Sequence, residues 1–188
     1  MMSEKTVIAQ TRHWLDSVVV GLNFCPFAGR ELQRQSIYFQ VSNETSLEAN
    51  LHLFIEECLR LDQSTDIETS LLIFANGFEQ FEDYLELVEL ANNLLGEQGY
   101  EGIYQVASFH PDYVFEGLTE SDAANYTNRS PFPMLHLLRE ASLARVLEHY
   151  PDPAQIPERN ISRARQLGLE KMKQMLIEAT QISEIQHD

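Results

Sequence analysis

The feature that most constrains the fold is a continuous apolar run over residues 70–75, which lies between two segments of helical periodicity. An apolar run of this length that ends at Asn76-Gly77 is typical of a strand buried on both faces. Strands are also predicted at residues 37–42 and 103–109, and a helical segment separates each strand from the next. Strand, helix, strand, helix, strand is the pattern of parallel strands joined by helical crossovers.

The sequence therefore predicts an α/β fold with a small, mainly parallel sheet of three to four strands, helices on both faces, and extra N- and C-terminal helices. Val114 and Phe115 are candidates for a short antiparallel edge strand. A ferredoxin-like α+β sandwich is the alternative. Residues 1–188 are expected to form a single domain, because this length is that of one ordinary domain.

Capping residues predict where several helices begin. Ser3 can cap a first helix, and Thr45 with Glu48 three residues later forms a capping box for the helix between the first two strands. The C-terminal part is predicted to hold one helix over residues 133–149 and another over residues 157–181, with a proline in its first turn.

The basic residues are unevenly placed in a chain whose net charge is −16. Residues 62–128 contain fourteen Asp and Glu but no Lys or Arg, whereas residues 129–173 hold eight basic and five acidic residues. Nucleic acids and anionic membranes select for clustered positive charge, so neither is expected as a partner. The acidic middle is interpreted as a solvated surface.

The cysteine content and the N-terminal segment indicate a cytoplasmic protein. The two cysteines, Cys25 and Cys58, are too few for a disulfide scaffold. No apolar run approaches the length that spans a bilayer, and charged residues interrupt the N-terminal segment where a signal peptide would be apolar.

The segment that follows the third predicted strand is the strongest candidate for a site. Ligands in open α/β sheets bind beyond the carboxyl ends of strands, and this strand ends at Phe109. His110 and Asp112 come next, two residues apart, so in an extended chain they point the same way. We interpret them as candidate catalytic residues, with His110 as a proton donor or acceptor oriented by Asp112.

The polar stretch over residues 125–136 supplies the candidate substrate-binding residues. Arg129 lies just before the predicted helix start at Pro133, and helix N-termini favour anions. Arginine suits two-pronged binding of a carboxylate or phosphate. The full candidate set is Asn125, Asn128, Arg129, Ser130 and His136.

Purely structural roles are the alternative for the same residues. Ser130 can cap the predicted helix, and His136 can be a core residue among leucines. Arg129 can simply pair with a nearby carboxylate, for which the candidates are Asp112, Glu116 and Asp122.

Two further kinds of chemistry are conceivable. His110, Asp112 and His136 match the ligand types of a two-histidine, one-carboxylate metal site, although such a pattern is common by chance. Cys25 is a candidate nucleophile: with Pro26 at the first helical position, Cys25 would cap a short helix carrying Arg30 and Arg34, which lowers a thiol pKa. The alternative is that Cys25 is a buried core residue, as we expect for Cys58.

No nucleotide-binding glycine loop, serine-hydrolase elbow or zinc-protease motif is present. Three stretches do match a recognisable pattern: residues 21–28 (GLNFCPFA), 107–113 (ASFHPDY) and 125–142 (NYTNRSPFPMLHLLREAS). They resemble an uncharacterised bacterial family, Domain of Unknown Function 1415. The resemblance spans nearly the whole chain and implies no reaction, cofactor or catalytic residue.

The leading hypothesis is an enzyme or binding protein for a small anionic metabolite. Arg129 and the helix start hold the anion, His110 exchanges a proton, and Asn125 and Asn128 orient the substrate. The alternative is a non-catalytic interaction protein whose acidic helix, around residues 79–97, docks a basic partner. The sequence specifies no reaction class, cofactor or oligomeric state.

Overall fold

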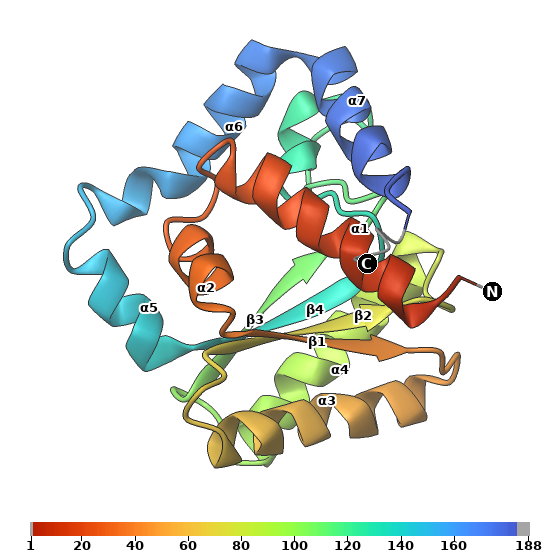
Figure 1. Ribbon diagram of the computed structural model, residues 1–188, viewed down its shortest axis with the longest axis vertical. Coiled ribbons are helices and arrows are strands. Elements are labelled where there is room, and N and C mark those ends of the chain that lie inside the picture. The colour runs from red at the N-terminus through yellow and green to blue at the C-terminus, as the bar shows by residue number, and fades with distance from the viewer. Residues whose placement is uncertain (1, 184–188) are drawn as a thin grey trace, which may run out of the picture.

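A four-stranded sheet forms the centre of the computed structural model, which describes residues 2–183 (Figure 1). The strands stand in the order β1-β2-β4-β3. β1 and β2 are parallel, whereas β4 runs antiparallel to both of its neighbours. β1, β2 and β3 therefore share one direction, and β4 is inserted between β2 and β3 in the opposite direction. The strand bounds are β1 Ile37–Ser42, β2 Thr69–Phe74, β3 Tyr104–Phe109 and β4 Met134–Arg139.

The prediction of three strands in one direction, joined by helices, is confirmed, but the mainly parallel sheet is wrong. Only β1 and β2 are parallel neighbours, because β4 separates β2 from β3. The ferredoxin-like alternative also fails, since a helix follows both β1 and β2 instead of the βαββαβ order. The predicted edge strand is also wrong: Val114 and Phe115 lie in a loop.

β4 occupies the first half of the segment predicted to be a helix over residues 133–149. α5, Glu140–Leu147, takes up the second half. Leu135 and Leu137 pack on one face of the sheet and Met134 on the other. A strand buried on both faces does not alternate between apolar and polar residues, so its pattern is the same as that of a buried helix.

Helices cover both faces of the sheet (Figure 1). One face carries α3, Leu47–Gln63, and α4, Phe81–Glu97. The other carries α1, Glu4–Trp14, its π-helical continuation Leu15–Val20, and α7, Leu169–Thr180. α2, Ala28–Arg34, and α6, Ile156–Leu167, lie on this second side. No helix within residues 2–183 is long and apolar enough to cross a membrane.

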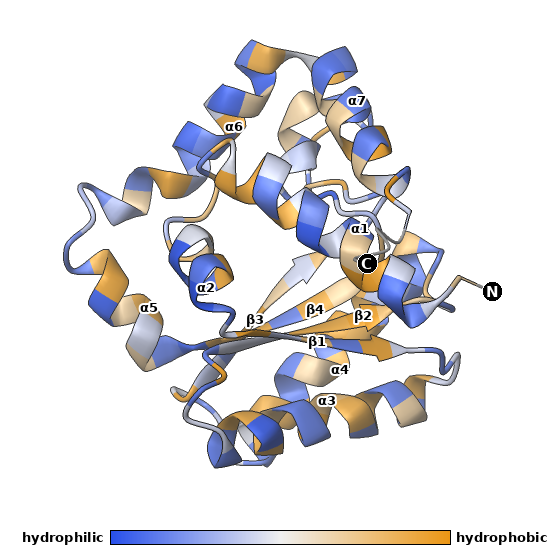
Figure 2. Ribbon diagram, in the orientation of Figure 1, coloured by the Kyte–Doolittle hydropathy of each residue, from blue (hydrophilic) through white to orange (hydrophobic). Residues whose placement is uncertain are grey.

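Each face of the sheet has its own hydrophobic core. Leu72 and Tyr84 of α4 belong to the core on one side, and Leu71 and Trp14 of α1 belong to the core on the other. Figure 2 shows β2 mostly in the hydrophobic colour, while the helices alternate between hydrophobic and hydrophilic residues. The sheet therefore separates the molecule into two layers, and a side chain in β4 reaches one core or the other, never both.

Three helix ends test the capping predictions. Ser3 caps α1 as predicted, accepting a hydrogen bond from the Thr6 amide at 3.1 Å. The cap of α3 is Ser46, which accepts from the Ala49 amide, and not Thr45. The predicted last helix is broken at Gly168, whose φ of 84° ends α6 before α7 begins.

Candidate functional site

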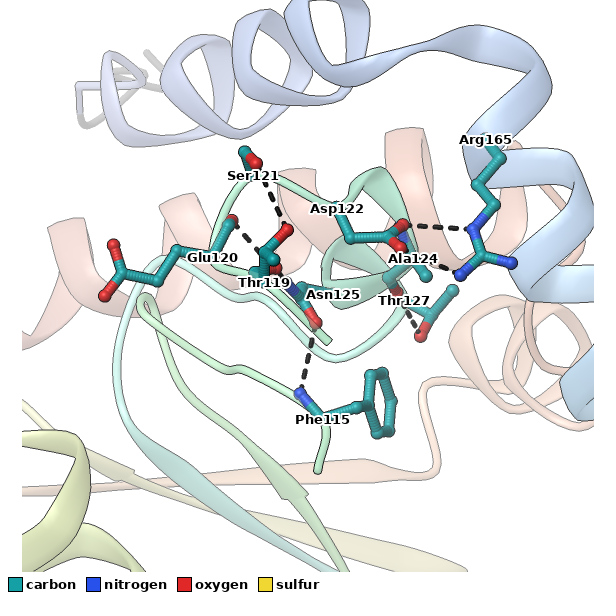
Figure 3. Close-up of polar contacts among 9 residues, drawn as sticks. All are labelled: Phe115, Thr119, Glu120, Ser121, Asp122, Ala124, Asn125, Thr127 and Arg165. Atoms are coloured by element: carbon teal, nitrogen blue, oxygen red, sulfur yellow. Dashed lines mark hydrogen bonds and ion pairs between the residues drawn. The ribbon is translucent and has the colours of Figure 1, made fainter. Parts of the chain in front are cut away.

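The loop between β3 and β4 is held together by its own polar side chains (Figure 3). Asn125 is fully buried; its Oδ1 accepts from the Phe115 amide at 3.1 Å, and its Nδ2 donates to the Thr119 carbonyl at 2.8 Å. Asp122 accepts from the Ala124 amide and pairs with Arg165 at 2.8 Å. Both polar groups of the Asn125 side chain therefore form hydrogen bonds with the backbone of the loop.

Two further candidate residues bond to nearby backbone in the same way. Asn128 donates from Nδ2 to the Ser108 carbonyl at 3.0 Å, which ties the loop to β3. Ser130 is fully buried and donates to the Phe132 carbonyl at 2.6 Å. It caps no helix, because the chain enters β4 at this point. The helix start predicted near Pro133 is therefore wrong, and with it goes the helix N-terminus that was expected to favour an anion there.

His110 is fully buried behind the loop, with both ring nitrogens engaged by backbone. Nε2 donates to the Phe78 carbonyl at 2.8 Å, and Nδ1 accepts from the Asp112 amide at 3.0 Å. The ring packs against Phe81 and Tyr84. Burial lowers the pKa of His110, so the ring is held neutral. The Asp112 amide, rather than its carboxylate, contacts the ring.

His136 lies on the opposite face of the sheet from His110. It stands beside Leu71, in the core under α1, and its Nε2 donates at 2.7 Å to the Thr69 hydroxyl, which in turn donates to a backbone carbonyl. Burial lowers the pKa of His136 to about 4. The metal alternative is wrong on this geometry, because the sheet separates the two histidines. Within residues 2–183 no three His, Cys, Asp or Glu side chains gather as metal ligands.

Asp112 and Arg129 do line one concavity beyond β3, of about 880 Å³. We call it the carboxyl-end cleft. Arg129 donates from Nε to the Tyr113 carbonyl at 3.0 Å and from Nη2 to the Glu120 carbonyl at 3.2 Å, and its guanidinium lies over the Tyr126 ring. His110 does not line this cleft. The charged lining residues are Glu79, Glu82, Asp112, Glu120, Arg129 and Lys173.

The charge of the carboxyl-end cleft does not favour an anion. Four carboxylates face two cations, and two donor groups of Arg129 are already used on backbone carbonyls. An anion entering here would meet a negative potential at close range, where charges are least screened.

Cys25 is packed against the core under α1 and forms no disulfide with Cys58. Burial raises the pKa of the Cys25 thiol, and hydrogen bonds from the Phe27 and Ala28 amides oppose this shift without cancelling it. α2 begins at Ala28, later than predicted. The environment is therefore the reverse of one that activates a thiolate. Cys58 is fully buried, as predicted.

A second cleft, of about 620 Å³, lies at the other edge of the sheet. We call it the amino-end cleft, because α2 leads into β1 there and Glu68 immediately precedes β2. α5 reaches the same edge because β4 is antiparallel, so Leu138 near its end pairs with Thr69 at the start of β2. Figure 1 shows α2 and α5 at this edge. The lining residues are Pro26, Phe27, Arg30, Glu31, Arg34, Glu68, Ser142, Arg145, Val146 and His149.

Cations surround the amino-end cleft. Arg30 and Arg34 are one turn apart on α2, so they share a face. Arg145 and His149 are likewise four residues apart, and Arg145 donates to the Ser142 hydroxyl at 2.8 Å. Arg34 has no hydrogen bond or ion pair with any described residue. Three arginines and two glutamates leave this lining with a net charge of +1 when His149 is neutral.

Sequence reasoning missed the amino-end cleft, although part of its signal was visible. In the sequence, Arg30 and Arg34 stand out only as neighbours of Cys25. Arg145 and His149 lie more than a hundred residues later, in a segment predicted as one continuous helix. Only the unexpected strand β4 carries α5 to α2, so no local pattern could join the two pairs.

Comparison with known proteins identifies the family of the chain. The model of a family described as a protein of unknown function, DUF1415, matches residues 6–174, and the chain belongs to this family. No curated protein and no solved structure matches it.

Proposed function

We propose that this DUF1415 protein binds a small anionic molecule, a carboxylate or phosphate metabolite, in the amino-end cleft. The observation that carries the proposal is the gathering of Arg30, Arg34 and Arg145 around one concavity of a chain whose net charge is −16. The proposal keeps the ligand class expected from the sequence and moves its site from the carboxyl ends of the strands to the amino ends.

The unusual placement of charge supports this assignment. Most other arginines are engaged elsewhere: Arg60 with Glu57, Arg165 with Asp122, and Arg139 with the carbonyls that end α3. By contrast, Arg34 has no hydrogen bond or ion pair with a described residue. The lining keeps a net charge of +1 after Glu31 and Glu68 are counted, so an anion that binds among the three arginines offsets this excess positive charge.

The chemistry of the guanidinium group narrows the ligand. Its planar donors match the two oxygens of a carboxylate or phosphate, which favours these anions over chloride. The cleft is open, and its arginines are mostly exposed. We therefore expect moderate affinity and recognition of the charged end of the molecule.

A thermal-shift screen of the purified protein tests the proposal. Ligands that bind only the folded state stabilise it, by about 2.7 kcal/mol at 100 times Kd, which is roughly 5–10 °C for a chain of this size. Phosphate esters and small carboxylates are expected to raise the melting temperature above that in chloride of equal ionic strength.

Two substitutions assign the effect to the cleft. Arg34→Ala and Arg145→Ala are expected to remove most of the anion-dependent stabilisation while leaving the melting temperature in chloride nearly unchanged, as usual for exposed residues. Arg163→Ala is the matched control, because Arg163 is exposed on α6 and lines neither cleft. The proposal fails if no anion stabilises the wild type, or if Arg163→Ala weakens binding as much as Arg34→Ala.

A surface of α4 supports the interaction-protein alternative as a second candidate. Leu85 is 44% exposed on this helix, among the exposed acidic residues Glu82, Glu86 and Glu89. An apolar residue within an acidic face can anchor a basic partner. Capture of a basic peptide by the wild type, lost in Leu85→Ser, would favour this candidate; equal capture by both proteins would remove it.

A further inference from the structure

Glu68, which lines the amino-end cleft, has one buried carboxylate oxygen without a hydrogen-bond partner. Among residues 2–183, Oε1 of Glu68 is the buried side-chain oxygen that no donor reaches. A buried polar atom normally finds a partner, because leaving it without one costs about 1–3 kcal/mol. The donor for this oxygen must therefore come from a molecule other than the described residues, either a ligand or a water molecule.

The backbone fixes Glu68 where it stands. Its amide donates to the Ser36 carbonyl at 2.8 Å, which ties Glu68 to the residue that precedes β1. The other carboxylate of the cleft, Glu31, is satisfied: Oε2 accepts from the Ser36 hydroxyl at 2.6 Å, and Oε1 lies 3.6 Å from Nε of Arg30. The unmet acceptor is thus specific to Glu68.

We propose that the ligand of the amino-end cleft carries a hydrogen-bond donor, a hydroxyl or an ammonium group, beside its anionic group, and that Glu68 accepts from that donor. The inference rests on the proposed function and names its ligand class: hydroxy acids, amino acids and hydroxylated phosphate esters. The arginines bind the anionic group, and Glu68 accepts a hydrogen bond from the hydroxyl or ammonium group next to it.

Glu68 also explains how the cleft would reject simpler anions. A carboxylate beside three arginines weakens the attraction for an anion that offers it no donor, because like charges then approach without a hydrogen bond. A site that hydrogen-bonds a hydroxyl or amine discriminates strongly against an analogue that lacks it, since the buried acceptor stays unpaired. The Glu68 side chain is therefore a specificity determinant rather than a source of affinity for every anion.

Matched probes separate binding of the anionic group from recognition of the neighbouring hydrogen-bond donor. Succinate, malate and aspartate share a four-carbon dicarboxylate frame and differ in a hydrogen, a hydroxyl or an ammonium group. Methyl phosphate and glycerol 3-phosphate make the same comparison for phosphate esters. By titration calorimetry we expect the donor-bearing member of at least one series to bind the wild type at least fivefold more tightly than its donor-free partner.

Substitution of Glu68 tests the role of that residue. Glu68→Ala is expected to reduce the preference to less than twofold and to tighten the binding of succinate, because the repulsive carboxylate is gone. Glu68→Leu is the second variant, in case the alanine variant folds poorly; it has no acceptor oxygen and should also lose the preference for aspartate over succinate. Glu97→Gln, an exposed carboxylate outside the cleft, is the control and should change neither value.

The outcomes distinguish failure of this inference from failure of the proposed function. If donor-bearing and donor-free anions bind the wild type equally, or if the preference survives in Glu68→Ala, the role of Glu68 is wrong and a water molecule is the donor, while anion binding stands. If no probe binds, or if Arg34→Ala leaves binding of every probe unchanged, the proposed function and this inference are both overturned.

Discussion

The side chain of His110 shows at the residue scale how a polar group near a strand end can serve the backbone. It donates to the Phe78 carbonyl and accepts from the Asp112 amide. Phe78 has a φ of 59°, a left-handed conformation that is costly for a bulky residue and persists only where its surroundings hold it. His110 is therefore part of what fixes the turn after β2.

His110→Leu is accordingly predicted to destabilise the protein by about 1–3 kcal/mol, because the Phe78 carbonyl loses its donor while buried. Urea denaturation measures the change, and anion affinity at the amino-end cleft should stay as in the wild type. A loss below about 0.5 kcal/mol, the range of ordinary surface substitutions, would contradict this structural role.

His110, which is buried, and His136, which is half-buried, also predict how stability depends on pH. Burial lowers the folded-state pKa of His110, and lowers that of His136 to about 4, below the unfolded value of 6.5. The unfolded chain then binds more protons, so the stability that these residues contribute is complete above about pH 6.5 and is lost as the pH falls toward 4.

For His136 the separation of the two pKa values corresponds to roughly 3 kcal/mol. The free energy of unfolding should therefore fall as the pH is lowered from 6.5 to 4. In the His136→Asn variant this free energy should fall less steeply over the same interval. If the free energy of unfolding depends on pH equally in the variant and in the wild type, His136 does not titrate as described.

At the scale of elements, the strands that sequence predicted are those with clear boundaries. β1 and β2 were found because turn residues or capping signals bound an apolar run, and β3 because Pro111 follows it closely. β4 was missed because its leucines are buried on both faces and favour helices as isolated residues. Pairing with β2 and β3 overrides that propensity, and no single-sequence pattern reports such pairing.

The candidate site was only partly predictable for the same reason. The polar segment after β3 was correctly expected to be a long loop, but which side chains turn to backbone depends on contacts across the loop. The amino-end cleft forms because β4 places α5 beside α2. The failure to predict β4 therefore also prevented prediction of this cleft. The charge of Arg34 and Arg145 was visible in the sequence, but their proximity was not.

The loop itself yields an element-scale prediction. Asn125→Ala leaves the Phe115 amide and the Thr119 carbonyl without their partner, and is expected to cost about 1–3 kcal/mol of stability. Because the loop lies at the opposite edge of the sheet, anion affinity should be unchanged. Denaturation and calorimetry on one preparation measure both, and weakened anion binding at full stability would instead place the site in this loop.

At the scale of the whole molecule, a net charge of −16 opposes the compact state through self-repulsion. Salt screens this repulsion, since the Debye length falls from about 30 Å at 0.01 M to about 10 Å at 0.1 M. The melting temperature should rise by a few degrees over this range of sodium chloride, equally in the wild type and in Arg34→Ala. A falling melting temperature would mean that attractive pairs outweigh the repulsion.

The central claim is that the anion binds between α2 and α5 and not beyond β3, and the NMR signals of arginine side chains report this directly. The Nε–H groups of Arg30, Arg34 and Arg145 would be assigned by single substitutions and followed while malate or glycerol 3-phosphate is added. We predict that these three signals shift with one common saturation curve, while those of Arg129 and Arg163 stay in place. A shift of the Arg129 signal alone, or no shift at any arginine with any probe, would contradict the account.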